Sequence, residues 1–217
     1  MKKLFSLFVA LLFTILLNAQ NDITIGLVMP NQEINGIKPD AYNILRSKLE
    51  KMLTTYGVSA FGGEFAMYPT VSVLEENLIE GGIKNFFKVK IDLTLNVVNL
   101  TSKTLFSSET WPLTGTSERV KSDAVKNAFT QLKGTDTRFK SFIDQAKSKI
   151  YEYYEEHQSV IFSKAITLSS TGEYEKAIAY LSGYPSQVPG YDDAQVLIRE
   201  IYLKYIDANA SKILNKA

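Results

Sequence analysis

The chain has 217 residues, and its 24 Lys and Arg nearly balance its 23 Asp and Glu, giving a formal net charge of +1. This balance argues against a protein that binds a nucleic-acid backbone, because such proteins carry a basic excess. The sequence contains no Cys and a single His. Disulfide scaffolds, thiolate zinc sites, iron–sulfur centres, cysteine nucleophiles and two-histidine metal sites are therefore excluded.

Residues 1–19 have the three regions of a secretory signal peptide. Lys2 and Lys3 form the basic region, residues 4–17 form the apolar region, and Ala19 precedes the expected cleavage site. The apolar run is shorter than the roughly 20 residues of a spanning helix, so we expect cleavage and no stable membrane span. No Cys follows the run, so lipid attachment through a thioether is not available. We therefore expect a periplasmic or secreted protein, for which the lack of Cys is suitable.

Residues 20–134 combine strand and helix patterns, and we predict one α+β domain there. A β-branched apolar run at residues 22–30 predicts a strand. An apolar repeat with helical spacing predicts a helix that Pro39 opens and Gly57 ends. The segment that follows is predicted to hold one or two further strands.

The clearest pattern lies between residues 87 and 97, where apolar and polar side chains alternate. This period of two predicts a strand with one buried and one solvent-facing side. A loop at residues 99–103 and a second strand at residues 104–113 complete a predicted hairpin. Ser117 is then predicted to cap a helix that Gly134 ends.

This order of elements, mostly antiparallel strands beside two helices, is typical of an α+β layer fold. The strand ending at Met29 and Pro30, the hairpin LNVVNLTSKTLFSSETW and the segment LTGTSERVKSDAVKNAFTQL resemble a family of bacterial envelope domains. That family includes the curli secretion pore protein, the lipoprotein activators of penicillin-binding proteins and the middle domain of a flagellar assembly protein. The resemblance covers roughly residues 22–133, and the chain departs from the lipid-anchored members by lacking their N-terminal Cys. The family shares no catalytic residues, so the resemblance implies no catalytic site.

Residues 135–217 are predicted to form an all-helical domain, because apolar residues recur there at intervals of three and four. One long helix is predicted from Asp136 or Thr137 to about Ser170. A last helix is predicted from residue 191 to 206, with a possible extension to residue 214.

The segment GEYEKAIAYLSGYPSQVPGYDDA resembles the second half of a tetratricopeptide (TPR) repeat. Ala177 takes the small-residue position of the motif, and Pro189 stands where its proline ends the repeat. Because a single repeat cannot bury its own core, we expect it to pack on another part of the chain or on another protein.

Tyrosines crowd the last helices and are the candidate partner-binding residues. They are Tyr174, Tyr180, Tyr184, Tyr191, Tyr202 and Tyr205. Tyrosine is enriched at protein interfaces, but TPR-like helices also use tyrosine for internal packing. Both roles therefore remain open for this set.

No catalytic constellation is predicted. His157 lies on the apolar stripe of the expected long helix, where packing is favoured over catalysis. The neighbouring carboxylates Glu75 and Glu76, and likewise Asp192 and Asp193, are expected to point apart. We therefore predict no catalytic residue, no cofactor and no metal site.

Two classes of function fit these patterns. The first is a non-catalytic envelope protein that acts as a protein-binding or assembly accessory module through its helical C-terminal part. Its partner would be another envelope protein or a second copy of the chain, and no nucleic acid. The alternative is a cell-envelope hydrolase that uses carboxylates without His or Cys, which requires two carboxyl groups converging in a cleft.

The signal-peptide pattern generates a first prediction. Secreted material should begin at Gln20, because cleavage is expected after Ala19. Intact-mass spectrometry of protein recovered from the envelope or the medium measures this directly. A mass corresponding to a chain that begins at Met1 would contradict the prediction.

Overall fold

The computed structural model describes residues 23–30, 37–60, 62–81 and 85–214. The chain divides into two compact units, Thr24–Glu152 and a helical unit that starts at Tyr153. The first unit combines a mostly antiparallel sheet with helices, and the α+β class followed by a helical region is confirmed. Helix α4 (Thr137–Glu156) begins in the first unit and ends in the second, whereas the domain boundary predicted from the sequence precedes this helix, after residue 134.

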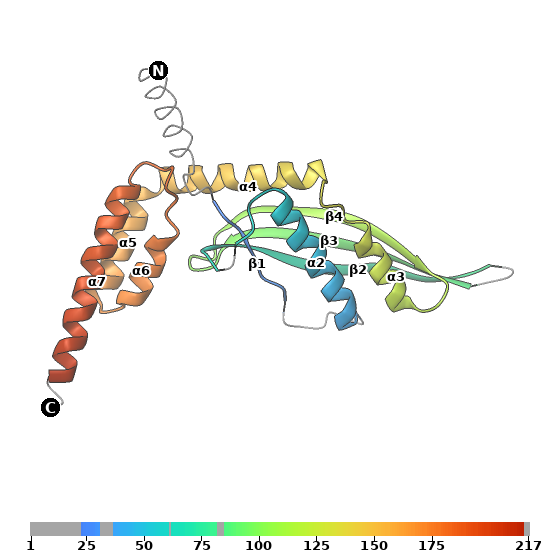
Figure 1. The fold of residues 1–217 in the computed structure, drawn as a ribbon, viewed down its shortest axis with the longest axis horizontal. Helices are drawn as coiled ribbons and strands as arrows, with labels where there is room; N and C mark the ends of the chain where they lie inside the picture. The colour runs from blue at the N-terminus through green and yellow to red at the C-terminus, as the bar shows by residue number, and fades with distance from the viewer. Residues whose placement is uncertain (1–22, 31–36, 61, 82–84, 215–217) are drawn as a thin grey trace, which may run out of the picture. The chain divides into compact units, whose positions relative to one another are not determined.

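Within the described residues, four strands form one sheet in the order β1-β2-β3-β4 (Figure 1). The strands are β1 (Gly26–Leu27), β2 (Phe65–Glu80), β3 (Asn85–Asn99) and β4 (Leu105–Ser117). β1 runs parallel to β2, and the other neighbours are antiparallel. The strand predicted at residues 22–30 is shorter than expected, because its regular pairing with β2 involves Gly26 and Leu27.

The alternation predicted for β3 is confirmed, with buried apolar residues between half-buried polar ones. The buried residues are Val89, Ile91, Leu93, Leu95 and Val97. The opposite face of the sheet is polar. There the hydroxyl groups of Thr94 and Thr110 lie 2.8 Å apart, and Ser108 donates a hydrogen bond to Asn96 Oδ1 at 2.7 Å. One face of the sheet therefore contributes to the hydrophobic core, and the other faces solvent.

Helices α2 (Pro39–Thr55) and α3 (Lys121–Thr130) cover the apolar face of the sheet (Figure 1). α2 has Pro39 at its start, as predicted, because the first turn does not need the missing N–H. It ends just before Gly57, which has a φ of 68°. Leu45 and Leu49 of α2 are fully buried against this core.

The first turns of α4 add aromatic packing to the α+β unit. Asp136 caps the helix, because its Oδ1 accepts a hydrogen bond from the Arg138 N–H at 2.9 Å. The rings of Phe139 and Phe142 lie 6.4 and 5.4 Å from that of Trp111 in β4. The Arg138 guanidinium lies 4.8 Å from the Trp111 ring centroid. These contacts hold the start of α4 on the sheet.

The helix cap predicted at Ser117 is wrong. Ser117 is the last residue of β4 and still pairs with Phe87 of β3. Its Oγ accepts a hydrogen bond from the Arg119 N–H at 3.1 Å, so it stabilises the turn and not the helix. α3 begins later, at Lys121, after the extended residue Val120.

The single long helix predicted from about residue 136 to Ser170 is also wrong, because the chain breaks at His157. The break separates α4 from α5 (Gln158–Ser170), and His157 has a non-helical ψ of 14°. Its Nδ1 lies 2.9 Å from the Tyr153 carbonyl oxygen, and its ring stacks on Tyr153 at 4.6 Å. The main-chain N–H of His157 also donates to the Tyr153 carbonyl oxygen at 3.0 Å, so the helical hydrogen bonds of α4 continue up to this residue.

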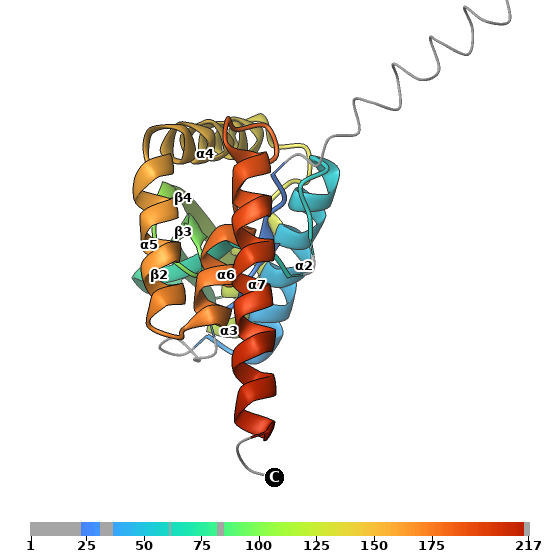
Figure 2. The ribbon, with the colours of Figure 1, turned by 90° about the vertical axis from the view of Figure 1, so that its left-hand side faces the viewer.

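The helical unit continues through α6 (Tyr174–Ser182) and α7 (Tyr191–Leu214), and α6 contacts both α5 and α7 (Figure 2). The helix end predicted at about Ser170 is confirmed, and Gly172 follows it with a φ of 80°. Ala177 of α6 and Ala194 and Ile201 of α7 are fully buried. The TPR assignment itself stays a prediction. No helix within the described residues is long and apolar enough to cross a membrane.

Sheet and helix approach each other closely at Gly115 of β4. A Cβ atom on Gly115 would overlap the carbonyl oxygen of Ala124 and lie 2.7 Å from the backbone nitrogen of Ala128. Ala124 and Ala128 both belong to α3 and are fully buried. The backbone of α3 therefore rests directly on the backbone of β4, and glycine is needed for this approach.

Gly115→Ala should therefore destabilise the protein by about 1–3 kcal/mol, because α3 must move away from β4. Urea denaturation followed by circular dichroism measures this change. Gly134→Ala is the matched control, since its Cβ would meet nothing closer than Thr55 Oγ1 at 3.4 Å. Equal denaturation midpoints for the two variants would contradict the inferred contact.

Candidate functional site

The tyrosines predicted to bind a partner do not share one environment. Tyr184 is buried, with 3% of its surface exposed, whereas Tyr202 is 51% exposed. The other four are half-buried. Tyr174 and Tyr180 lie on α6, and Tyr191 and Tyr205 lie on α7. Their roles must therefore be assigned one at a time.

Tyr184 packs inside the helical unit. Its ring makes an edge contact with Tyr154 at 5.1 Å and a tilted contact with Phe162 at 5.7 Å. Its hydroxyl donates a hydrogen bond to the Pro189 carbonyl oxygen at 2.8 Å. Burial raises the pKa of its phenol. Tyr184 thus stabilises the loop between α6 and α7. Its role is internal packing, one of the two roles considered for the tyrosines.

Tyr174 and Tyr205 join α6 to α7. Their ring centroids lie 6.1 Å apart, and the Tyr205 hydroxyl donates a hydrogen bond to Glu175 Oε1 at 2.8 Å. Tyr180 is half-buried on α6, and this burial raises its pKa, with a further contribution from Tyr153. Tyr202 differs from all of these because it lies on the outward side of α7.

Large apolar side chains gather on that outward side, which we call the outer stripe of α7. The stripe consists of Val196, Tyr202, Leu203, Ile206, Ile213 and Leu214, and all of them are exposed. At 3.6 residues per turn these positions span an arc of about 120°. The buried residues Ala194 and Ile201 lie on the other side of the helix. Figure 2 shows α7 continuing past the ends of α5 and α6 toward the C-terminus.

The sequence reading did not identify this stripe, although a signal was present. Val196 and Leu203, and likewise Ile206 and Ile213, are seven residues apart. Two turns of helix separate such residues, so they project from nearly the same side. The inward residues of α7 are also apolar, and this obscured the one-sided pattern that normally marks a helix face.

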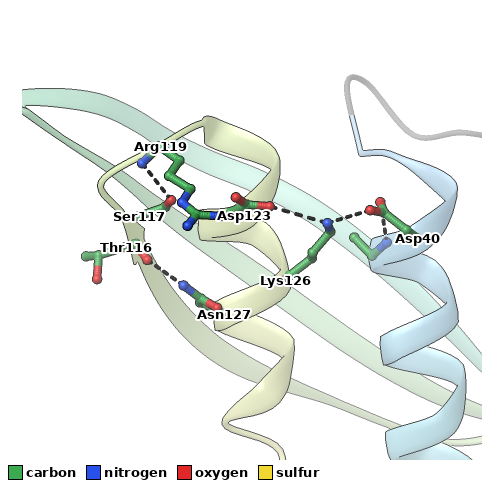
Figure 3. Close-up of polar contacts among 8 residues, drawn as sticks. Asp40, Thr116, Ser117, Arg119, Asp123, Lys126 and Asn127 are labelled. Atoms are coloured by element: carbon green, nitrogen blue, oxygen red, sulfur yellow. Dashed lines mark hydrogen bonds and ion pairs between the residues drawn. The ribbon is translucent and has the colours of Figure 1, made fainter.

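The α+β unit carries a polar depression of about 500 Å³ at the junction of β4 and α3. It is lined by Phe86, by residues 116–119, and by Asp123, Lys126 and Asn127. Figure 3 shows these polar contacts, in which Asn127 Nδ2 donates a hydrogen bond to the Thr116 carbonyl oxygen at 2.8 Å. The lining of the depression therefore includes acidic, basic and amide side chains.

Lys126 lies between two carboxylates in this depression (Figure 3). Its Nζ is 2.5 Å from Asp40 Oδ2 in α2 and 3.3 Å from Asp123 Oδ1 in α3. The hydrogen bond from Lys126 holds the pKa of Asp40 below its ordinary value, and the two carboxylates raise the pKa of Lys126. This arrangement braces α2 against α3, and a lysine held by two carboxylates supplies no general acid or base near neutral pH.

The carboxylates Glu75 and Glu76 point apart, as predicted from the sequence. Glu75 contacts Lys90 of β3 at 2.7 Å, while its neighbour Glu76 forms an ion pair with Lys121 of α3. The two side chains therefore point to different partners. Asp192 and Asp193 lie exposed in the first turn of α7. In the part of the chain that the structure describes, no cluster of three or more His, Asp and Glu side chains is arranged to hold a metal ion.

A second apolar region lies on the long hairpin of β2 and β3. Leu78 faces Phe87 across the strands, and Ile79 faces Phe86. Leu78, Ile79 and Phe86 are exposed. Directly opposite residues share one face of a ribbon, so both faces of this hairpin carry apolar side chains.

Comparisons with known proteins give a distant likeness. No protein-family model matches the chain, and no curated protein matches it. A minor lipoprotein from Acinetobacter baumannii is 12% identical, with a TM-score of 0.36, over 58% of this chain and 92% of that chain. The PelC dodecamer from Paraburkholderia phytofirmans is 16% identical, with a TM-score of 0.33, over 52% and 88%. A neuraminyllactose-binding hemagglutinin homolog from Helicobacter pylori is 18% identical, with a TM-score of 0.40, over 64% and 91%.

The chain thus has a distant structural resemblance to α+β domains of bacterial envelope lipoproteins. At these identities and TM-scores the likeness carries no argument about function. The residues of α7 and of the β4–α3 depression must be interpreted from their own chemistry.

The Lys126 contacts generate a prediction about pH. Lys126→Met should return the pKa of Asp40 toward its ordinary value, because the hydrogen bond from Lys126 is the main cause of its depression. A lowered carboxyl pKa stabilises the fold above the ordinary value, and this contribution is lost as the pH falls through the lowered value. The stability difference between the native protein and Lys126→Met should therefore shrink on acidification.

Carbon-detected NMR titration of the Asp40 carboxyl group measures the first effect. Lys140→Met is the matched control, since Lys140 contacts Asp144 at 2.6 Å within α4 and not Asp40. An Asp40 titration curve that is the same in Lys126→Met and in the native protein would show that the contact is absent in solution.

Proposed function

We propose that this protein is a non-catalytic module of the bacterial cell envelope that binds protein through the outer stripe of α7. The observation that carries the proposal is the exposure of large apolar side chains along one side of this helix. Leu203 is 56% exposed and Ile213 is 70% exposed. A group of exposed apolar side chains on one side of a helix is typical of a protein contact surface, whereas single exposed apolar residues are ordinary.

Burial of the stripe supplies the driving force for binding. Removing apolar surface from water is worth roughly 25 cal/mol per Å². Helix-in-groove and helix-on-helix recognition both use apolar anchors that repeat every three or four residues. Leu203 and Ile206 form one such step, and Tyr202 adds an amphipathic ring beside them. Tyr202 is therefore the tyrosine of the predicted set that fits a partner contact best.

The signal-peptide pattern supports the proposed compartment. Residues 1–19 have the signal-peptide pattern, and they lie outside the described residues. The lack of Cys is compatible with an oxidising compartment and leaves no thiol for lipid attachment. Both points support a periplasmic or secreted location.

Nothing specific favours the alternative of an envelope hydrolase. Glycoside hydrolysis needs two carboxyl groups across a cleft, one with a raised pKa. Asp40 has a lowered pKa and is bound to Lys126. Glu75 and Glu76 are bound to lysines of different elements. These carboxylates are consistent with structural ion pairs, which supports a non-catalytic protein.

Site-specific photo-crosslinking tests the proposal in living cells. A photoreactive p-benzoylphenylalanine at Tyr202 should form an intermolecular adduct in the envelope, because this side chain lies on the outer stripe. The same probe at Ser211 is the control, since Ser211 is exposed on α7 but lies outside the arc of the stripe. Equal yields at the two positions, or no adduct at Tyr202, would contradict the proposal.

Affinity measurements complete the test once the adduct has identified the partner. Leu203→Glu should weaken binding by more than about tenfold, which is the loss expected for a central apolar anchor. Ser211→Glu places the same charge on the same helix and should leave binding unchanged. Tyr184→Phe should lower stability by about 0.5–1.5 kcal/mol through the lost bond to Pro189 and leave binding unchanged.

A further inference from the structure

We propose that the polar depression at the junction of β4 and α3 binds a neutral saccharide. This site lies in the α+β unit and goes beyond the protein contact proposed for α7, on which it does not depend. Three features of the lining carry the proposal: its balanced charge, its open hydrogen-bonding groups and its exposed aromatic ring.

The depression has the size of a small-molecule site. Its volume of about 500 Å³ falls within the range of roughly 300–1,000 Å³ that is usual for such sites. Asp123, Lys126 and Asn127 are spaced by three and four residues, so they project from one side of α3. Thr116 and Ser117 are the last two residues of β4. A helix and a strand therefore position much of the lining before a ligand arrives.

The lining carries no excess of either charge. Arg119 and Lys126 supply two cations, and Glu118 and Asp123 supply two carboxylates. Lys126 is already held between Asp40 and Asp123, at 2.5 and 3.3 Å. A site for phosphate or another anion would need a cationic excess with free donors. The balance therefore favours an uncharged ligand.

Several polar groups of the lining keep hydrogen-bonding capacity. Asn127 donates through Nδ2 to the Thr116 carbonyl oxygen at 2.8 Å, so its Oδ1 is left as an acceptor (Figure 3). Asp123 contacts Lys126 through Oδ1, which leaves Oδ2 as a second acceptor. Arg119 is exposed, and among the described residues no carboxylate forms an ion pair with its guanidinium. Donors and acceptors are thus both available, as a ligand rich in hydroxyl groups requires, because each hydroxyl donates and accepts.

Phe86 adds an apolar surface to this polar lining. Its side chain is 36% exposed. It precedes Phe87, which pairs with Ser117 at the end of β4, so Phe86 stands just past the last residue of that strand. The face of an aromatic ring carries partial negative charge. The C–H groups on one face of a sugar ring pack on such a surface while its hydroxyl groups bond to polar neighbours. The aromatic ring beside planar polar side chains therefore fits a saccharide.

NMR titration of the processed chain with two neutral disaccharides, maltose and N,N′-diacetylchitobiose, tests the proposal. At least one of them should shift the amide resonances of the lining residues in a saturable way, with a Kd on the order of millimolar. The absence of saturable shifts with both sugars at about ten times that concentration overturns the proposal. Inorganic phosphate and trialanine are the competing ligands, and saturation by either of these without saturation by a sugar overturns it as well.

The aromatic contact is tested by substitution. Phe86→Ala should weaken sugar binding by about threefold to tenfold, because the ring contact is lost. Phe86→Trp should retain binding, since it restores an aromatic face. Ile79→Ala is the matched control, because Ile79 is exposed directly opposite Phe86 and does not line the depression. A loss in Ile79→Ala equal to that in Phe86→Ala overturns the stacking role.

The donor role of Arg119 has its own variant. Arg119→Met removes the guanidinium without breaking an ion pair among the described residues, and it should also weaken sugar binding. Arg199→Met makes the same exchange at an exposed position of α7 and should leave the Kd unchanged. Circular dichroism checks that each variant is folded. A Kd that neither Arg119→Met nor Phe86→Ala changes would place the sugar elsewhere and overturn the proposal.

A free disaccharide and a glycan chain share this chemistry, and chitin beads distinguish them. Chitin is a polymer of the sugar in N,N′-diacetylchitobiose. Retention of the native protein on the beads, with less retention of Phe86→Ala, supports a glycan chain as the ligand. Saturable binding of a disaccharide without retention on the beads supports a free saccharide.

This proposal and the one for α7 fail separately. Leu203→Glu should leave the sugar Kd unchanged, because Leu203 lies in the helical unit. Phe86→Ala should leave the photo-crosslinked adduct at Tyr202 unchanged. Loss of the sugar-induced shifts in Leu203→Glu would show that the site is not confined to the α+β unit and would overturn the present proposal.

Discussion

The contact of β4 with α3 at Gly115 is the constraint on which the α+β unit depends. Here two backbones meet with no side chain between them, and the small residues Ala124 and Ala128 complete the approach from the helix. Because α3 lies this low on the sheet, its Lys126 can reach Asp40 of α2. The helical layer is thereby tied together across its outer surface as well as through the core. A helix held farther from the sheet would break this connection and open the core beneath it.

α7 combines two apolar sides in one helix, and the exposure of one of them to water has a physical cost. Its inner side, with Ala194 and Ile201, is satisfied by the helical unit itself. Its outer side carries the exposed stripe, and the helix continues beyond the ends of α5 and α6 (Figure 2). A helix that is apolar around most of its circumference is normally a buried helix. The protein contact proposed for the outer stripe would supply such an interior.

Parts of this structure could be predicted from the sequence because their determinants are local. The alternation in β3, the Pro39 start of α2 and the glycine turn before α6 each depend on neighbouring residues. The break at His157 could not, because the apolar spacing runs through it without interruption. The helix cap predicted at Ser117 was wrong for a different reason. It is a good capping residue, but pairing with Phe87 holds it in the sheet.

The candidate site was harder to predict than the fold. Six tyrosines share a composition and a region, yet Tyr184 closes an internal loop and Tyr202 faces outward. Composition cannot separate the two, since burial is decided by which side of each helix meets its neighbours. The seven-residue spacing from Val196 to Leu203 was a local signal of the outer stripe. It was masked because the inner positions of α7 are apolar as well.

The irregular pairing between Val73 and Glu75 in β2 decides where two neighbouring carboxylates go. Leu74 is an extra residue there, so that Glu75 pairs with Lys90 and Glu76 stands opposite the inward residue Val89. Glu76 therefore lies on the helix side of the sheet, within reach of Lys121. In an unbroken register Glu75 would occupy that side instead, and the acidic anchor for the start of α3 would lie one residue earlier along the ribbon. The extra residue Leu74 thus shifts the alternation of β2 by one position. As a result Glu76, and not Glu75, forms the ion pair that links α3 to the hairpin.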